Sequence, residues 1–411
     1  MATFRFGAAA QCELPLEDYT LLSAESDEHP LLDDPATGVR NALAAPLNFP
    51  PLIAATAPGD VVAIALAGDV PRGNAVVRGA VEALLEAGVA PAMITIVSQQ
   101  KIEAREDLEN ELAALDADGV KFEVHDPDDE QGIAMVGVNS AKEPLRLNRT
   151  LAEADLVLPV SAQRLPAGGQ REESKFAGLF PRFSNRDTAA RVRLESGNES
   201  AKVQKRLRAE ADEAGWLLGV QMTVSVVPGG NGGVAAVLAG DPDEVSRTGN
   251  ELTREIWERT AAEPGDLVIA AVAGDEREQT WDNLARAVAA ASLVVAPGGA
   301  IAVCSELDAK PTGPLLRLRE AVDFGEVQRE LARDEANEAH PALVLAKALE
   351  EGPVYLRSKL PSELVESLGM TAIESDAELA RLSAGREHCI IIEEAQRLVP
   401  RPMVREEWHF D

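Results

Sequence analysis

The sequence predicts an α/β protein of two domains whose sheets are largely parallel. Short apolar runs alternate with amphipathic helical stretches along the chain, which is the pattern that βαβ units produce. A chain of 411 residues is also too long for one ordinary hydrophobic core. Because only 4% of the residues are aromatic, the cores must be built mainly from Ala, Val, Leu and Ile.

The first βαβ unit shows the pattern most clearly. Val61–Leu66 is an apolar run typical of a buried strand, and Asn74–Ala87 places apolar side chains on one helix face before Gly88 ends the helix. The same patterns predict strands at Met93–Val97, Lys121–Val124, Ala154–Pro159, Val220–Val227, Val234–Ala239, Leu267–Ala273, Ala300–Cys304, Val354–Arg357 and Cys389–Ile392. They predict helices at Glu103–Leu115, Ser200–Ala214, Asp243–Ala262, Gln279–Ala291, Pro341–Glu350 and Asp376–Ser383.

A domain boundary is expected near residue 263. The second series of strands and helices begins after Glu263-Pro264-Gly265, a sequence typical of a turn. We therefore expect an N-terminal domain over residues 1–263 and a C-terminal domain over residues 264–411. The polar stretch Ser161–Asn185 is long for a simple connection, which favours a functional loop or a disordered segment.

The charge of the chain favours a small-molecule partner over nucleic acid or membrane. The 69 acidic residues outnumber the 39 basic ones, so the formal net charge is −30. An acidic field repels phosphate backbones and anionic lipid surfaces. Most of this charge is expected to serve solubility, and a local site can still be positive.

Several features indicate a cytoplasmic protein. The three cysteines, Cys12, Cys304 and Cys389, are odd in number, far apart and without metal-binding spacing, which fits a reducing compartment. The first residues do not show the basic and then apolar pattern of a signal peptide. No apolar run reaches the roughly 18 residues that a membrane span needs.

Candidate binding residues follow the predicted strands, because ligands of open α/β sheets bind outside the carboxyl ends of the strands. Gly68–Asn74 combines the carboxylate of Asp69, the guanidinium of Arg72 and a helix N-terminus, which together suit an anion. The alternative is that Asp69 only caps the helix and Arg72 is solvated. Ser98–Lys101 and Gly274–Gln279 follow two other strands.

Other candidates have weaker support from the residues alone. Gln279 and Arg286 are seven positions apart and share a helix face, although a surface role explains that pair equally well. Lys175 is the one lysine of the polar stretch, where a lysine is usually solvated. His125 follows a strand, and His340 precedes a proline at a helix start. No two histidines have metal-binding spacing, so the sequence predicts no metal site.

The order of the segments resembles the nickel-dependent lactate racemase family. Leu31–Arg72 contains a Pro-Gly-Asp turn and a strand whose end is similar to the family's SDxTRP-like motif. The later landmarks are Leu147–Pro159, Val224–Pro242, Gly265–Arg286 and Val354–Pro361. These matches run in order along nearly the whole chain, which makes the resemblance more specific than any single motif.

The resemblance implies two α/β domains with the active site in an interdomain cleft. Enzymes of the family carry a nickel-pincer nucleotide that is tethered to a lysine, and a histidine also binds the nickel. Two further histidines exchange the C2 proton of a 2-hydroxy acid, while the cofactor accepts and returns a hydride. By position, Asp69, Arg72, Gln279 and Arg286 match substrate-binding residues, and Lys175 is the best match to the tethering lysine.

The chain departs from the family at the catalytic positions. Gln100 stands where the family has one acid/base histidine, and Ala162–Leu165 contains no histidine where the family has the other. No histidine lies between His125 and His340, so the nickel ligand is absent too, and His340 takes the place of a tryptophan that packs on the cofactor. Glutamine cannot accept and return a proton near neutral pH. Racemisation by the family mechanism and the nickel-pincer nucleotide are therefore both disfavoured.

The leading hypothesis is a lactate racemase-like protein that binds a small hydroxy-carboxylate in the cleft through Arg72, Arg286 and Gln279. One alternative is an active isomerase or lyase on a 2-hydroxy acid, with a remodelled site in which Gln100 binds the substrate and Lys175 or His125 acts as the base. Another is a non-catalytic sensor or subunit whose partner supplies the chemistry. These readings rest on fold analogy, which does not by itself establish a function.

Overall fold

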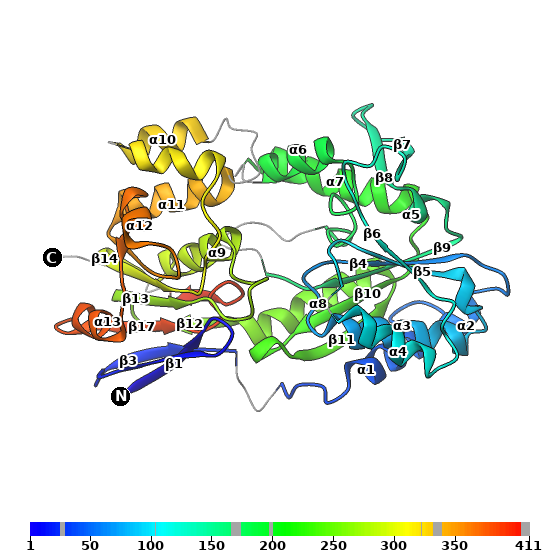
Figure 1. Cartoon of the computed structure of the whole chain (residues 1–411), viewed down its shortest axis with the longest axis horizontal. Coiled ribbons are helices and arrows are strands. Elements are labelled where there is room, and N and C mark those ends of the chain that lie inside the picture. Colours follow the sequence, from blue (N-terminus) through cyan, green and yellow to red (C-terminus); the bar gives the residue numbers. More distant parts are fainter. Residues whose placement is uncertain are drawn as a thin grey trace. The chain divides into compact units, whose positions relative to one another are not determined.

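The computed structural model describes residues 1–24, 29–102, 104–165, 174–196, 200–321, 323–331 and 339–403. The chain divides into two compact units (Figure 1). Unit 1 comprises Met1–Glu25, Leu165–Gln170 and Glu255–Asp411, and unit 2 comprises Ser26–Arg164 and Arg171–Arg254. Each unit contains a six-stranded sheet, which confirms the predicted α/β class.

The sheet of unit 2 has the strand order β11-β10-β9-β4-β5-β6. All neighbouring strands are parallel except β10 and β11, which form the expected antiparallel pair around a glycine-rich turn. The strands are β4 (Val62–Leu66), β5 (Ile94–Ser98), β6 (Lys121–Val124), β9 (Leu156–Ala162), β10 (Thr223–Pro228) and β11 (Val234–Gly240). A two-stranded sheet of β7 (Ile133–Val138) and β8 (Pro144–Asn148) belongs to the same unit.

Helices cover both faces of this sheet (Figure 1). The helices of unit 2 are α1 (Pro35–Ala44), α2 (Leu52–Ala55), α3 (Gly73–Glu86), α4 (Arg105–Ala113), α5 (Arg149–Glu153), α6 (Arg186–Ser196), α7 (Ala201–Leu217) and α8 (Pro242–Trp257), the last of which reaches into unit 1. Helices α1 and α3 lie on one face, whereas α6 and α7 lie on the other (Figure 1).

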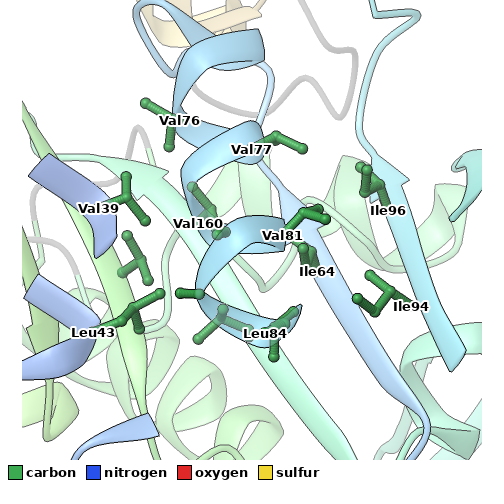
Figure 2. Close-up of a cluster of buried hydrophobic side chains, with 14 of the residues drawn as sticks. Val39, Leu43, Ile64, Val76, Val77, Val81, Leu84, Ile94, Ile96 and Val160 are labelled. Carbon is green, nitrogen blue, oxygen red and sulfur yellow. The ribbon is translucent and has the colours of Figure 1, made fainter. Parts of the chain in front are cut away.

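Strand β4 is buried on both faces because its side chains alternate between two cores. Ile64 points into the core shared with α1 and α3, where it lies near Val81 and Leu84 of α3 (Figure 2). Ala63 and Ala65 point into the opposite core, with α6 and α7. Burial of each large aliphatic side chain in such a core contributes about 1.5–3 kcal/mol.

Helices α1 and α3 approach each other closely at Gly79. A Cβ atom built on this glycine would lie 2.3 Å from the Ala36 carbonyl oxygen of α1. The residue's lack of a side chain therefore lets the backbones of the two helices touch. At the start of α3, by contrast, a Cβ atom on Gly73 would meet no atom within 4 Å.

The sheet of unit 1 has the strand order β16-β15-β14-β13-β17-β3, and all its neighbouring strands are parallel. Its strands are β3 (Tyr19–Leu22), β13 (Gly265–Ala271), β14 (Val295–Cys304), β15 (Val354–Arg357), β16 (Thr371–Ala372) and β17 (Cys389–Ile392). Strands β12 (Glu258–Ala261) and β18 (Val399–Pro402) form a separate parallel pair. The helices are α9 (Trp281–Ser292), α10 (Phe324–Leu331), α11 (Ala339–Glu351), α12 (Ser362–Ser367) and α13 (Asp376–Ser383).

The N-terminal residues belong to unit 1, which corrects the prediction that residues 1–263 form one domain. Strand β3 completes the unit 1 sheet beside β17. The hairpin of β1 (Ala2–Phe6) and β2 (Ala10–Leu14) buries Phe4 and Leu14 against Leu267 and Ile269 of β13. Apolar contacts between the two ends of the chain therefore override the sequence order.

Two local predictions are also corrected. The predicted helix Asp243–Ala262 ends at Trp257, because the next residues form β12 and pair with β18. The strand predicted at Ala300–Cys304 begins earlier, since β14 runs over Val295–Cys304 and includes Pro297-Gly298-Gly299. There, Gly298 has a φ of 74°, a left-handed conformation that glycine adopts without cost. Among the described residues, no helix has the length and apolar character that crossing a membrane requires.

The contact at Gly79 makes a prediction about stability. Gly79→Ala should lower the free energy of unfolding by about 1–3 kcal/mol, because the added methyl group must push α1 away from α3. Gly73→Ala, in the same helix but in open space, should change it by less than about 0.5 kcal/mol. Chemical denaturation of both variants measures the difference, and equal stability of the two would contradict the proposed close approach.

Candidate functional site

Unit 2 contains a polar pocket beside the carboxyl end of β9. Its wall includes the end of β9, one face of β10, the segment from Ser174 to Arg182 and the first turns of α8. The lining residues are Pro159, Ser161, Ala162, Gln163, Arg164, Ser174, Lys175, Phe176, Ala177, Gly178, Leu179, Arg182, Thr223, Ser225, Pro242, Val245, Ser246 and Asn250. We call this the basic pocket, because Arg164, Lys175 and Arg182 are its charged lining residues.

The topology of the sheet explains why the pocket forms here. From β4 the chain continues outward through β5 and β6, and it later returns to β9 on the opposite side of β4. Such a reversal of strand order opens a crevice at the carboxyl ends of the two central strands, where ligands of open α/β sheets bind. Asp69 follows β4, and Arg164 follows β9. The two residues therefore meet at this switch point.

Asp69 holds both arginines of the pocket. Its Oδ2 atom lies 3.0 Å from Nε of Arg164 and 2.9 Å from Nη2 of Arg182. The Asp69 side chain is only 9% exposed. Burial raises the pKa of this carboxyl, but the charges of Arg182 and Arg164 outweigh that effect and hold the pKa below its ordinary value of 3.8. Asp69 is therefore ionised at neutral pH.

The loops around Asp69 are held by hydrogen bonds of Gln99. The Gln99 Oε1 atom accepts from the Gly68 backbone amide at 3.0 Å and from Nη1 of Arg182 at 3.4 Å. Gln100, which was predicted to stand where the family has a histidine, is exposed, but its amide group lies beside Gly68. Both glutamines that follow β5 therefore lie near Asp69. Their amide side chains do not take up or release a proton near neutral pH.

The structure does not support the alternative that Asp69 caps helix α3. The N-cap residue of this helix is Arg72, and no side chain caps the helix. Arg72 has a left-handed backbone with a φ of 53°, which is uncommon for a residue with a side chain. Its side chain is exposed. The predicted substrate anchor thus lies at the start of α3, outside the lining of the basic pocket.

Arg182 reaches the pocket because the segment that carries it is anchored in the core. Phe176 and Phe180 of that segment are buried in the core with α6 and α7. Gly178 lies directly against Ser161 of β9, since a Cβ atom on this glycine would be 2.2 Å from the serine Cβ. The second half of the polar stretch Ser161–Asn185 is thus tightly packed, whereas residues 166–173 lie outside the described residues.

Lys175 lies at the edge of the basic pocket. Its Nζ atom is 2.8 Å from both carboxylate oxygens of Asp243, in the first turn of α8. The lysine side chain is 24% exposed, whereas that of Asp243 is 74% exposed. Lys175 therefore has a counter-ion that solvent reaches easily, so the pair costs little to separate.

The pocket also contains a buried hydroxyl group. Ser225 of β10 is only 4% exposed, and its Oγ atom has no hydrogen-bond partner among the described residues. Its neighbour across the sheet is Ser161 of β9, with which it pairs in parallel register. By contrast, the hydroxyl of Ser174 donates to Asp212 at 2.8 Å.

Gln279 and Arg286, the predicted substrate residues of unit 1, bind backbone groups. Gln279 donates to the Gly274 carbonyl at 3.0 Å, and its Oε1 atom accepts from the Ser305 hydroxyl and the Glu306 amide. Arg286 donates to the carbonyls of Gln396 and Leu165, both at 2.9 Å. Through these hydrogen bonds both side chains stabilise loops of unit 1. Their predicted roles in binding a substrate stay predictions.

Neither histidine of the prediction lines the basic pocket. His125 is buried, donates from Nε2 to the Ser184 carbonyl at 3.0 Å and packs against Phe183. Burial lowers the pKa of this imidazole below its ordinary value of 6.5, although the hydrogen bond and nearby acidic groups oppose the effect. His340 lies in α11 of unit 1. His125 is therefore a buried residue whose side chain contacts Ser184 and Phe183, and its predicted catalytic role stays a prediction.

The residues of the basic pocket do not fit a nickel cofactor. Among the described residues, no three histidine, cysteine, aspartate or glutamate side chains are grouped so that they could hold a metal ion. The pocket lining offers hydroxyls, amides and two guanidinium groups, and a guanidinium has no lone pair to give to a metal. Lys175 lines the pocket, but none of the lining residues is a histidine, the nickel ligand that the family resemblance implies.

Comparison with known proteins identifies the relatives of this fold. Residues 8–162 match the model of the lactate racemase N-terminal domain. The lactate racemase apoprotein from Thermoanaerobacterium thermosaccharolyticum is 16% identical, with a TM-score of 0.74 over 97% of this chain and 100% of the other. A structural-genomics protein from Thermotoga maritima is 13% identical, with a TM-score of 0.65 over 91% and 100%. No curated protein sequence gave a significant match.

These findings confirm the predicted resemblance to the lactate racemase family. The family model covers the N-terminal part of the chain, and the shared fold extends over nearly all of it. At identities this low the structural matches establish the fold alone. Residues 8–162 thus resemble a lactate racemase N-terminal domain, the chain has a lactate racemase-like fold, and its site must be interpreted from its own residues.

Sequence reasoning overlooked Arg164, Arg182 and Ser225 as site residues. Arg164 had a usable signal, since it is a cation directly after a predicted strand. Arg182 had none, because only the packing of its segment brings it to Asp69. Ser225 lies inside an apolar strand sequence, where a serine carries no information about its partners.

The arrangement around Asp69 predicts a pH-dependent contribution to stability. Asp69→Asn should lower the free energy of unfolding by about 1–3 kcal/mol near neutral pH, because it leaves two partly buried guanidinium groups without their counter-ion. Since the folded-state pKa is lowered, the contribution is fully present above 3.8 and is lost as the pH falls through the folded-state pKa. Denaturation curves from pH 7 down to pH 3 measure this loss.

Asp118→Asn is the matched control, because Asp118 is exposed. This control should change the free energy of unfolding by less than about 0.5 kcal/mol at every pH. If Asp69→Asn behaved like the control, Asp69 would not be the group that holds the arginines.

Proposed function

We propose that this lactate racemase-like protein binds a small hydroxy-carboxylate in the basic pocket and does not racemise it by the family mechanism. The observation that carries the proposal is the attachment of two guanidinium groups, Arg164 and Arg182, to the buried carboxylate of Asp69 at the switch point of the sheet. Fixed guanidinium groups at such a position are well suited to bind a carboxylate.

The charges of the pocket favour an anion with one negative charge. In the ion pairs of the described lining residues, Arg164, Lys175 and Arg182 supply three positive charges and Asp69 and Asp243 supply two negative charges, so that these pairs leave one positive charge. This local excess contrasts with the net charge of −30 for the chain. A monocarboxylate neutralises it without leaving an unpaired charge.

Arg164 is the group best placed to bind that carboxylate. Its ion pair with Asp69 is made through Nε, and the described residues offer no other partner to its guanidinium group. The two terminal nitrogens therefore remain for a ligand, and they can bind both oxygens of one carboxylate. Arg182 is more constrained, since it also donates to Gln99 and to the Ala177 carbonyl.

The pocket lining is equipped for binding and contains no histidine, the residue type that exchanges the C2 proton in the family. Lys175, one of the two bases that the sequence suggests, is paired with Asp243. A racemase needs an acceptor and a donor on opposite faces of the substrate carbon, each with a pKa near the working pH. The permanently charged Arg164 lies in the segment where the family has one histidine, and Gln100 stands in place of the other. His125, the alternative base, points into the core at the Ser184 carbonyl.

This proposal keeps the class of ligand that is expected from the sequence, but it assigns the binding of that ligand to different arginines. Arg164 and Arg182 take the part that the sequence hypothesis gave to Arg72 and Arg286. The proposal rests on the burial of Asp69 and on the polar lining of the pocket, together with the similarity of the fold to a lactate racemase apoprotein.

Titration calorimetry with 2-hydroxypropanoate tests the proposal. Arg164→Gln should weaken binding by about 10–100-fold, since a charge-assisted hydrogen bond to a carboxylate contributes about 1.5–3 kcal/mol. The control Arg247→Gln removes an exposed arginine of α8 that pairs with Glu244 and Glu251 on the same helix, and it should bind like the unchanged protein.

A chiral assay on the same samples separates binding from catalysis. Either enantiomer of 2-hydroxypropanoate should remain unchanged during long incubation with the protein. Interconversion of the enantiomers would contradict the second half of the proposal and favour a remodelled enzyme. Unaltered binding by Arg164→Gln would show that the basic pocket is not the site.

A further inference from the structure

Ser225 is a buried polar residue of the basic pocket lining that the proposed binding of a carboxylate by Arg164 and Arg182 does not use. Its Oγ atom is buried and has no hydrogen-bond partner among the described residues. A buried hydroxyl that makes no hydrogen bond costs free energy, because it has given up its bonds to water. A native structure retains such a group at low cost only where another molecule completes it.

The direction of the Ser225 side chain follows from the alternation of β10. The flanking residues Val224 and Val226 point into the core shared with α1 and α3. Successive side chains of a strand point to opposite faces, so Ser225 points to the other face. On that face it lines the basic pocket together with Arg182 and Lys175.

A hydroxyl group is the natural partner for this serine. A serine hydroxyl donates one hydrogen bond and accepts others, so it can bind a second hydroxyl in either direction. The cations of the pocket already account for the carboxylate of a ligand. A hydroxyl group on the same ligand would then form a hydrogen bond with Oγ of Ser225 on β10. A ligand with a methylene group at that position would leave Oγ without a partner.

We propose that Ser225 is a specificity-determining residue that selects acids carrying a hydroxyl group over the same acids without it. The inference rests on the proposed function of the basic pocket. It adds the residue that recognises the hydroxyl group of the ligand. When a buried polar group of a site forms a hydrogen bond with a ligand hydroxyl, an analogue without the hydroxyl leaves that group unpaired and binds more weakly.

The test compares 2-hydroxypropanoate with propanoate, which differ only in the hydroxyl group. The unchanged protein should bind the hydroxy acid about 2–12-fold more tightly, the ratio that one neutral hydrogen bond provides. In Ser225→Ala this ratio should fall to about one, through weaker binding of the hydroxy acid and equal or tighter binding of propanoate. Titration calorimetry of both acids with each protein gives the ratio directly.

Two further measurements distinguish this role from a structural one. The thermal unfolding midpoint of Ser225→Ala should be equal or higher, because the substitution removes an unsatisfied buried hydroxyl. Ser292→Ala, which removes a hydroxyl of α9 that donates to the Val288 carbonyl, should leave the ligand ratio unchanged. An equal loss of affinity for both acids in Ser225→Ala would assign the serine to the pocket's structure and overturn the inference.

The outcomes also separate this inference from the proposed function. One outcome would support the carboxylate site but contradict the role of Ser225. In that outcome both acids bind, Arg164→Gln weakens the binding of both, and Ser225→Ala leaves the ratio of the two affinities unchanged. If neither acid binds the unchanged protein, both the proposed function and the inference are wrong.

Discussion

A single buried carboxylate organises the candidate site of this protein. Asp69 binds Arg164 and Arg182 through the same oxygen atom, and Gln99 ties Arg182 to the neighbouring strand end. Without the carboxylate, two positive charges would repel each other in a partly buried pocket. With it, they are fixed where the strand order reverses, the position at which open α/β sheets bind ligands. The geometry of the basic pocket therefore depends on one ionised group.

The same interaction underlies our proposal that this lactate racemase-like fold binds a ligand without the family's chemistry. A histidine exchanges protons near neutral pH, whereas a guanidinium group stays charged and can only bind. Arg164 lies in the segment where the family carries a histidine, and its charge is stabilised by Asp69. Lys175, the match to the tethering lysine, contacts Asp243 and lies beside hydroxyl and amide groups that suit an organic anion better than a metal.

Much of this architecture could be predicted from the sequence, because hydrophobic periodicity and turn residues are local signals. Lys121–Val124 and Val354–Arg357 form strands with the predicted bounds, and the strand-end rule pointed to Asp69. The N-terminal strand β3 could not be placed, since its partner β17 lies at the other end of the chain. Arg182 could not be predicted either, because the burial of Phe176 and Phe180 in a distant core sets its position.

The most direct test of the account is a crystal structure of the protein purified from the organism that makes it and soaked with a 2-hydroxy acid. The account predicts a carboxylate within hydrogen-bond distance of Arg164 and Arg182, the ligand hydroxyl beside Ser225, and an unmodified Lys175. A nickel-bearing nucleotide joined to Lys175, or a ligand bound away from the basic pocket, would contradict it.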